Sequence, residues 1–238
     1  SEAEAALFRQ RSGLSAERVH GVCNGVDLEW FDPAAALPNP YADAHGDAPV
    51  LVFAGAMDYW ANVDAVQWFA DEVLPRILTT RPNAQFVICG ARPTTEVVAL
   101  GIRSNISVTG RVDDIRPYVY HATVSVASLR IARGIQNKVL EAMALARPVV
   151  CTPQALEGID AVPGADLALA KTAEQFADTV LDLIATPARA AVMGEQARQR
   201  MVEAYGWPAQ MAVLDRIIAG VLAGVSTGAP SPMQETAA

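Results

Sequence analysis

The chain has 238 residues, and 52% of them are hydrophobic, which gives enough apolar surface for one large α/β domain or two small ones. Its formal net charge is -8, and no cluster of about five or more lysines and arginines occurs. This charge balance excludes a surface for nucleic acid or for anionic membranes.

The first fifty residues predict little regular structure. Residues 7–12 are expected to end a helix that Gly13 stops, and residues 19–23 are expected to form a short strand. The sequence "NGVD" at residues 24–27 predicts a turn. Residues 32–49 are rich in proline, alanine and aspartate, and this composition predicts a linker or a surface loop.

From residue 49 onward, apolar strands alternate with helices. Strands are predicted at residues 49–55, 84–90, 106–110, 123–128 and 148–152. Helices are predicted at residues 62–79, 93–101, 114–121 (capped by Asp113 or Asp114), 135–146, 172–185, 187–204 and 208–223. This alternation indicates a parallel sheet covered on both faces, which is a doubly wound, Rossmann-like α/β fold.

Cysteine usage and hydropathy limit the compartment. Cys23, Cys89 and Cys151 are far apart in apolar contexts, which argues against a disulfide framework or a zinc site and favours a reducing cytoplasm. No apolar run reaches the roughly 18 residues of a membrane span. The charged, alanine-rich residues 1–11 do not resemble a signal peptide.

A ligand crevice is predicted beyond the carboxyl ends of the strands, where doubly wound sheets bind their ligands. Gly55, Gly90 and Gly110 end three of the predicted strands, and Gly134 lies in the loop after the fourth. Glycine at these turns allows the backbone to come close to a ligand.

The stretch "GIQNKVLEAMALARPVV" at residues 134–150 predicts an anion site. Gly134 precedes a helix N-terminus, where free backbone N–H groups and the helix dipole attract phosphate. Ile135, Gln136 and Asn137 would supply these N–H groups. Gly134 also has a simpler interpretation, as a residue that permits a tight turn.

Two charged side chains follow on the same helix. Lys138 lies in the first turn, where the dipole disfavours a cation, so an anionic ligand is one reason for its presence. Glu141 leans back toward the helix N-terminus and could accept hydrogen bonds from a ribose diol. A solvent-facing Glu141, or an ion pair with Lys138, remains the alternative.

These motifs in combination resemble a known family. The stretch from residue 130 to 150, "RIARGIQNKVLEAMALARPVV", resembles the signature of retaining family 4 glycosyltransferases with the GT-B fold. With "FAGAMDYWANVDAVQWF" at residues 53–69, it is similar to the exosortase-associated sugar transferases of bacterial exopolysaccharide clusters. "NGVD", followed by Phe31 and Pro33, resembles the family's mark for the start of its C-terminal half, and the resemblance covers residues 1–222.

The resemblance implies a donor site with departures from the family pattern. That pattern has two spaced glutamates, and Glu141 matches the second, which binds the ribose, while Arg133 stands at the first. The arginine and lysine that clamp the diphosphate in many members would fall on Ala56 and Ala61. We therefore expect Arg133 and Lys138 to act as the catalytic cations in their place.

The resemblance also places the rest of the donor. Gly55 and Ala56 are expected beside it, and the base is expected at Gly110, Arg111 and Val112. Residues 1–18 are expected to form the end of an interdomain helix or linker, and residues 19–206 a Rossmann-like nucleotide-sugar-binding domain. A C-terminal helix is expected at residues 207–224 and a disordered tail at residues 225–238.

The implied activity is retaining transfer of a hexosyl unit from a nucleoside diphosphate sugar in bacterial surface or exopolysaccharide synthesis. No metal or other cofactor is expected, because GT-B enzymes generally need none and no D-x-D motif ends a strand. An acceptor-binding N-terminal domain and exopolysaccharide assembly proteins are the expected partners, and nucleic acid is not. The location is expected to be cytoplasmic, with any contact at the inner membrane made by that other domain. The isolated chain is expected to bind nucleotide and to catalyse nothing.

Two other function classes stay open. A nucleotide-sugar epimerase-like GT-B enzyme would have a similar half-site, and a degenerate, non-catalytic binding module would explain the residues at positions 56, 61 and 133. Other classes lack their motifs, since the sequence has no G-x-S-x-G, no P-loop and no G-x-G-x-x-G. The three histidines show neither triad nor zinc spacing.

Overall fold

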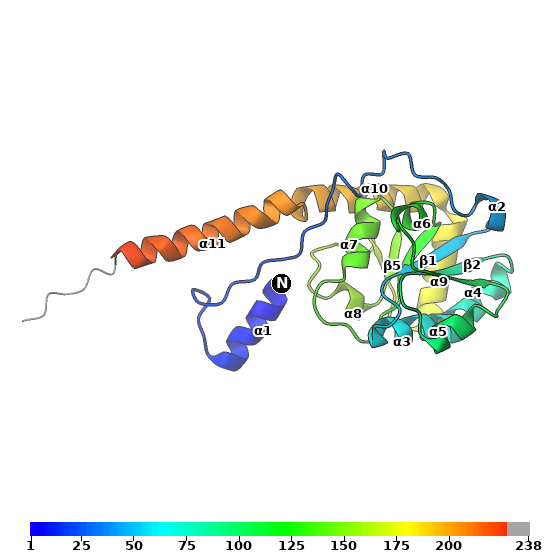
Figure 1. Cartoon of the computed structure of the whole chain (residues 1–238), viewed down its shortest axis with the longest axis horizontal. Coiled ribbons are helices and arrows are strands. Elements are labelled where there is room, and N and C mark those ends of the chain that lie inside the picture. The colour runs from blue at the N-terminus through cyan, green and yellow to red at the C-terminus, as the bar shows by residue number, and fades with distance from the viewer. Residues whose placement is uncertain (228–238) are drawn as a thin grey trace, which may run out of the picture.

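The computed structural model describes residues 1–227, which form a six-stranded parallel sheet with helices on both faces (Figure 1). The spatial strand order is β3-β2-β1-β4-β5-β6. The strands are β1 Val50–Ala54, β2 Gln85–Cys89, β3 Ile106–Gly110, β4 Val124–Ala127, β5 Val149–Cys151 and β6 Ala168–Leu169. The predicted doubly wound, Rossmann-like fold is confirmed.

Apolar packing explains why both faces of the sheet are covered. Every residue of β1 is buried, so this central strand needs helices above and below it. On one face, the ring of Phe69 lies 4.4 Å from that of Phe86 on β2 and 5.7 Å from that of Phe176 on α9 (Ala173–Ala185).

Helices cover both faces of the sheet. Helices α5 (Thr95–Leu100) and α9 lie on one face, and α6 (Arg116–Tyr120) and α7 (Asn137–Ala144) lie on the other (Figure 1). Helix α10 (Pro187–Ala204) packs against α7 and α9. Asp114 accepts a hydrogen bond from the backbone N–H of Arg116, but the N-cap of α6 is Ile115 and makes no side-chain cap bond, so the predicted cap at Asp113 or Asp114 is wrong.

The helix predicted at residues 62–79 is present but interrupted. It consists of α3 (Trp60–Trp68), a π-helical turn η1 (Phe69–Val73) and α4 (Leu74–Thr80). Pro75 has no backbone N–H and its ring crowds the preceding turn, so the wider turn before it accommodates the proline.

The strand predicted at residues 19–23 is wrong. Among the described residues, this segment is a loop that pairs with no strand, and the ladder contact nearby is the isolated bridge between Val26 and Gly206. Three short elements were not predicted, because two to four residues show no periodicity: α2 Ala42–His45, α8 Pro153–Leu156 and β6.

The N-terminal helix ends where predicted, and the C-terminal helix extends further than predicted. Helix α1 (Glu2–Ser12) starts before residue 7 and ends at Gly13, as expected. Helix α11 (Trp207–Thr227) passes the boundary predicted at residue 224, while residues 228–238 of the predicted tail lie outside the described residues. Within the described part, no helix is long and apolar enough to span a bilayer. The four domain boundaries stay a prediction.

Two glycines bring the ends of β1 and β2 together. The N–H of Gly55 donates to the carbonyl of Cys89 at 3.0 Å, and a Cβ on Gly90 would lie 1.7 Å from the carbonyl oxygen of Gly55. No side chain fits at Gly90. The strand order reverses between β1 and β4, so this close approach borders the switch point where such sheets bind ligands.

We expect Gly90→Ala to lower the free energy of unfolding by about 3 kcal/mol or more, because its methyl group would collide with backbone. Urea unfolding measures this loss. Gly220→Ala on α11 is the matched control, since a Cβ there meets no heavy atom within 4 Å. Equal unfolding midpoints for Gly90→Ala and the wild type would contradict the close approach.

Candidate functional site

The N-terminus of α7 presents unpaired backbone donors. Gly134 has a left-handed φ of 71° and turns the chain into the helix. Gln136 is the N-cap without a capping side-chain bond, and its amide instead donates to the carbonyl of Gly134 at 3.1 Å. Within residues 1–227, the N–H groups of Asn137 and Lys138 donate to no acceptor, so they remain available to an anion.

Lys138 projects from this first turn into the body of the domain. Its Nζ lies 4.3 Å from the ring centroid of Phe53 and donates a hydrogen bond to Oδ1 of Asn62. Burial lowers the pKa of Lys138 to about 7, while the charge of Glu141 acts in the opposite direction. The Lys138 ammonium therefore loses its proton readily near neutral pH, and an anion beside it would favour the charged form.

Glu141 lies one turn further along α7. Burial raises the pKa of its carboxyl group, and the charge of Lys138 partly offsets that effect. Among the described residues, the Glu141 carboxylate accepts no hydrogen bond and has no cation within ion-pair distance. The predicted alternative of a close ion pair with Lys138 is therefore wrong, and the carboxylate has free acceptor capacity.

Two adjoining pockets lie along the carboxyl edge of the sheet. The inner pocket, about 260 Å³, is lined by Ala54, Gly55, Ile115, Ile135, Asn137, Lys138 and Glu141. The outer pocket, about 360 Å³, is lined by Trp30, Gly55, Ala56, Gly90, Ala91, Arg92, Arg111, Val112, Asp113, Asp114 and Ile115. They share Gly55 and Ile115, so they form one crevice at the switch point between β1 and β4.

The outer pocket has a fixed aromatic wall and an exposed cation. The guanidinium carbon of Arg116 lies 3.4 Å from the ring centroid of Trp30, and Arg116 is held by Asp114 at 2.7 Å. Arg111 is exposed at the rim and pairs with no carboxylate among the described residues. This wall offers stacking surface and positive charge, which suits a planar, anionic ligand.

Most of the predicted site residues meet in this crevice. Gly55, Ala56, Arg111 and Val112 line the outer pocket, and Ile135, Asn137, Lys138 and Glu141 line the inner one together with Gly55. Gly110, with a φ of 67°, ends β3 just before Arg111. Gly134 and Gln136 shape the turn into α7, as described above. Arg133 is exposed on the same loop and lines neither pocket.

Three residues of the site were not predicted. Asn62 is buried and holds Lys138, but asparagine at a helix start usually indicates a cap. Trp30 lies next to Phe31 without any periodic pattern. Arg92 has a left-handed φ of 54° and pairs with Asp58 across the outer pocket's rim, and no sequence signal indicates either feature.

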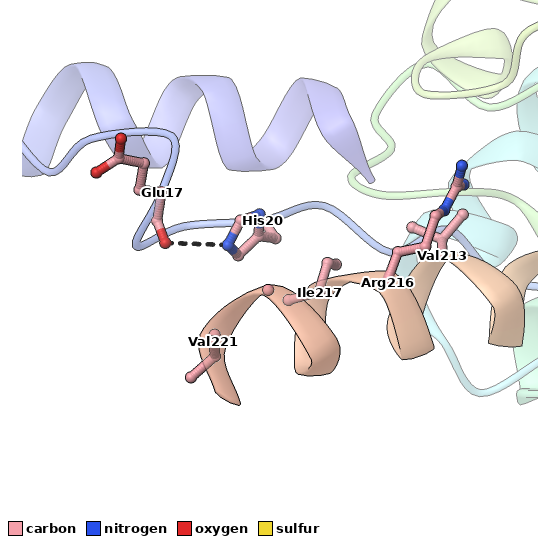
Figure 2. Close-up of a pocket in the computed structure, with 7 residues that line it drawn as sticks. Glu17, His20, Val213, Arg216, Ile217 and Val221 are labelled. Atoms are coloured by element: carbon pink, nitrogen blue, oxygen red, sulfur yellow. Dashed lines mark hydrogen bonds between the residues drawn. The ribbon is translucent and has the colours of Figure 1, made fainter. Parts of the chain in front are cut away.

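No group of three or more metal-ligating side chains occurs among residues 1–227. A larger groove, about 630 Å³, lies between the loop after α1 and helix α11 (Figure 2). In it, His20 contacts the carbonyl of Glu17 at 3.1 Å, and Val213, Ile217 and Val221 provide an apolar wall. It contains no predicted site residue and no strand end, so we place the functional site in the crevice.

The structure defines a Rossmann-like α/β domain with a crevice at the switch point of its sheet. Among solved structures, a glycosyltransferase from Rickettsia africae superposes with a TM-score of 0.76 at 14% identity, over 93% of this chain and 62% of its own. Anabaena HepE, solved with UDP and glucose, superposes with a TM-score of 0.71 at 14% identity, over 94% of this chain and 61% of its own. The C-terminal domain of LpcC, a glycosyl transferase group 1 family protein of Francisella tularensis, superposes with a TM-score of 0.62 at 20% identity. The alignment covers 77% of this chain and 100% of the LpcC domain.

At these identities the likeness shows the fold alone, and this chain spans less than two thirds of the first two structures. No curated protein sequence matches the chain. The family model "Glycosyl transferases group 1" matches residues 48–186, which is more than half of the chain. The protein therefore belongs to the group 1 glycosyl transferases.

We expect the free energy of unfolding to rise with pH between about pH 7 and pH 10 because of Lys138. The folded protein holds this amine with a pKa of about 7, whereas its ordinary value is 10.5. The unfolded chain thus binds more protons across that window, and stability increases with pH there. Urea unfolding of the wild type and Lys138→Met at about pH 6, 7, 8 and 9 measures the effect, which the variant removes.

Lys171→Met, at an exposed lysine, is the matched control and should keep the wild-type slope. Burial raises the pKa of Cys89 to about 11 and of Cys151 to about 12, which lowers stability at high pH in every variant. The informative quantity is thus the difference between Lys138→Met and the wild type at each pH. A difference that does not change with pH would contradict the burial of the Lys138 amine.

Proposed function

We propose that the crevice binds a nucleoside diphosphate sugar and that the whole protein transfers its hexosyl unit with retention of configuration at the anomeric carbon. One observation carries this proposal: the free N–H groups of α7, Lys138 and Glu141 border one pocket at the switch point of the sheet. Phosphate and ribose are the groups that these donors, this cation and this acceptor would bind together.

The diphosphate is assigned to the N-terminus of α7. The N–H groups of Asn137 and Lys138 and the Lys138 ammonium would bind its oxygens and stabilise the charge that develops as the diphosphate leaves. Arg133, exposed on the preceding loop, is the second proposed catalytic cation.

The ribose and base are assigned to the two ends of the crevice. The carboxylate of Glu141 would accept the ribose hydroxyl hydrogens, since it has no other hydrogen-bond donor among the described residues. The base would lie at Gly110, Arg111 and Val112, beside the ring of Trp30. No step requires a metal, because the cations and helix N-terminus act on the leaving group.

Family membership and one structural relative support the assignment. HepE was solved in complexes with UDP, with UDP-glucose and with UDP and glucose. We extend the proposal to the retaining family 4 enzymes, and to the exosortase-associated transferases of exopolysaccharide synthesis, on the motifs of residues 53–69 and 130–150. Since the chain spans 62% of the Rickettsia africae structure and 61% of HepE, the acceptor site is assigned to a further domain, which would also make any contact with the inner membrane or assembly proteins.

A non-catalytic nucleotide-binding module is the second candidate. The position of Arg133 favours it, because this residue replaces the family's first glutamate and lines neither pocket. Release of UDP from UDP-glucose by the whole protein in the presence of acceptor extract would support the transferase. Nucleotide binding without any release would support the module.

We expect one nucleoside diphosphate among UDP, GDP and ADP to raise the melting temperature of this chain. A ligand at 100 times its dissociation constant stabilises a protein by roughly 2.7 kcal/mol, which is a shift of a few degrees for a domain of this size. Glu141→Ala should fold and lose most of that shift, because the ribose hydroxyls lose their acceptor. A thermal-shift series over nucleotide concentration measures both effects.

Glu195→Ala, at an exposed glutamate in the middle of α10, is the matched control and should keep the shift. If no nucleotide at millimolar concentration changes the melting temperature of the wild type, the proposed donor site is wrong for this chain. If Glu141→Ala keeps the full shift, the ribose assignment is wrong.

A further inference from the structure

Asn62 lies in the first turn of α3, and both the oxygen and the nitrogen of its buried side-chain amide have hydrogen-bond partners. It is 5% exposed. Its Nδ2 donates to the backbone carbonyl of Ala56 at 2.8 Å, and its Oδ1 accepts from Nζ of Lys138. Because a carbonyl can only accept, the bond to Ala56 fixes the orientation of the amide and directs the oxygen toward the lysine.

Helix capping does not explain Asn62. Helix α3 begins after Tyr59, which is its N-cap, and Asn62 lies inside the helix. Its side-chain oxygen accepts from Lys138, 76 residues further along the chain, rather than from a backbone N–H of its own helix. The side chain therefore links the loop after β1 to the N-terminus of α7.

The Lys138 ammonium has no competing anionic partner among the described residues. The nearby carboxylates of β1–α3 and of the loop before α6 pair with arginines instead: Asp58 with Arg92, Asp64 with Arg130 and Asp114 with Arg116. From β1, only apolar groups and the ring of Phe53 face Nζ. Glu141, on the same helix as Lys138, raises the pKa of the lysine through its charge but forms no ion pair with it.

We propose that Asn62 is a positioning residue that holds the Lys138 ammonium at the inner pocket, where it meets the diphosphate of the bound nucleotide. This inference rests on the proposed function. Its physical basis is that a neutral amide oxygen fixes an ammonium group without neutralising it, so the full charge remains for the ligand. A carboxylate at this position would hold the lysine more strongly and repel the diphosphate.

The backbone leaves little room for another arrangement. A Cβ on Gly55 would lie 2.9 Å from Nδ2 of Asn62 and 3.2 Å from Nζ of Lys138. The glycine thus allows both side chains to pass directly beneath the loop that follows β1. Lys138 reaches the inner pocket from this side, beside Gly55.

The first test measures the affinity for UDP by calorimetry, at about pH 5.5 and at about pH 8. Asn62→Ala removes the acceptor of the ammonium, so the amine of the free protein stays neutral to lower pH and binding must also protonate it. A fall of one unit in the pKa of Lys138 makes UDP binding about tenfold weaker than in the wild type at pH 8, and less than about twofold weaker at pH 5.5.

Two comparisons make this result specific. Asn62→Ala combined with Lys138→Met should bind UDP no more weakly than Lys138→Met alone, because Asn62 acts only through the lysine. Gln67→Ala, one turn further along α3, is the matched control and should bind like the wild type at both pH values. An equal loss at both pH values, or an additive double variant, would overturn the positioning role.

The second test needs no ligand. The chain contains only two lysines, Lys138 and Lys171, so ε-carbon labelling gives two NMR signals, and Lys171→Met assigns them. Asn62→Ala should lower the titration midpoint of Lys138, and Asn62→Asp should raise it, while Lys171 stays constant in both. If the two substitutions only disturbed the fold, they would not shift the titration midpoint of Lys138 in opposite directions.

The outcomes separate the two claims. Opposite shifts, together with a pH-dependent loss of UDP affinity, support the positioning role. Unchanged midpoints in a protein that binds UDP overturn that role and leave the proposed function standing. If the wild type does not bind UDP, GDP or ADP, the proposed function fails, and the role of Asn62 toward a diphosphate fails with it.

Discussion

A buried ammonium group needs partners that replace its water shell, and the geometry of this site follows from how Lys138 meets that need. Removing an ammonium ion from water costs several kcal/mol in a protein. One hydrogen bond to a charged group returns about 1.5–3 kcal/mol, and a contact with an aromatic face about 0.5–2 kcal/mol. Asn62 and Phe53 supply one of each, so the cost is only partly offset and the pKa of Lys138 falls to about 7.

The remaining cost can be offset by a ligand with negative charge. A diphosphate at the N-terminus of α7 would provide that charge on the open side of Lys138. Gly55 has no Cβ, which leaves room for the side chains of Asn62 and Lys138 beside the loop after β1. The amide of Asn24, in the "NGVD" turn, donates to Asn137 at 2.9 Å and fixes the start of α7 from the other side. The site is thus held by backbone geometry and neutral amides, which leave its charges for the nucleotide.

Much of the fold could be predicted from the sequence, because long apolar strands and amphipathic helices determine a parallel sheet. The π-helical turn before Pro75 and the two-residue strand β6 could not, because they arise from tertiary packing over a few residues. The segment at residues 19–23 has a strand-like composition but pairs with no strand of the sheet.

The residues of the candidate site also fall into two groups, those that the sequence could predict and those that it could not. Residues near a helix N-terminus, such as Lys138 and Glu141, could be predicted because their spacing along one helix fixes their place. Asn62 and Trp30 reach the crevice from other segments, and only the folded chain shows which polar or aromatic side chain faces it. Arg133, expected to be a catalytic cation, is exposed and lines neither pocket, so its role stays a prediction.

The central claim is that a nucleoside diphosphate lies across the N-terminus of α7, and a crystal structure of this chain with UDP tests it most directly. The account predicts diphosphate oxygens within hydrogen-bond distance of Lys138 Nζ and of the N–H groups of Asn137 and Lys138. It predicts the ribose hydroxyls on Glu141 and the base beside Val112. UDP bound outside the crevice, or with its diphosphate away from Lys138, would contradict the account.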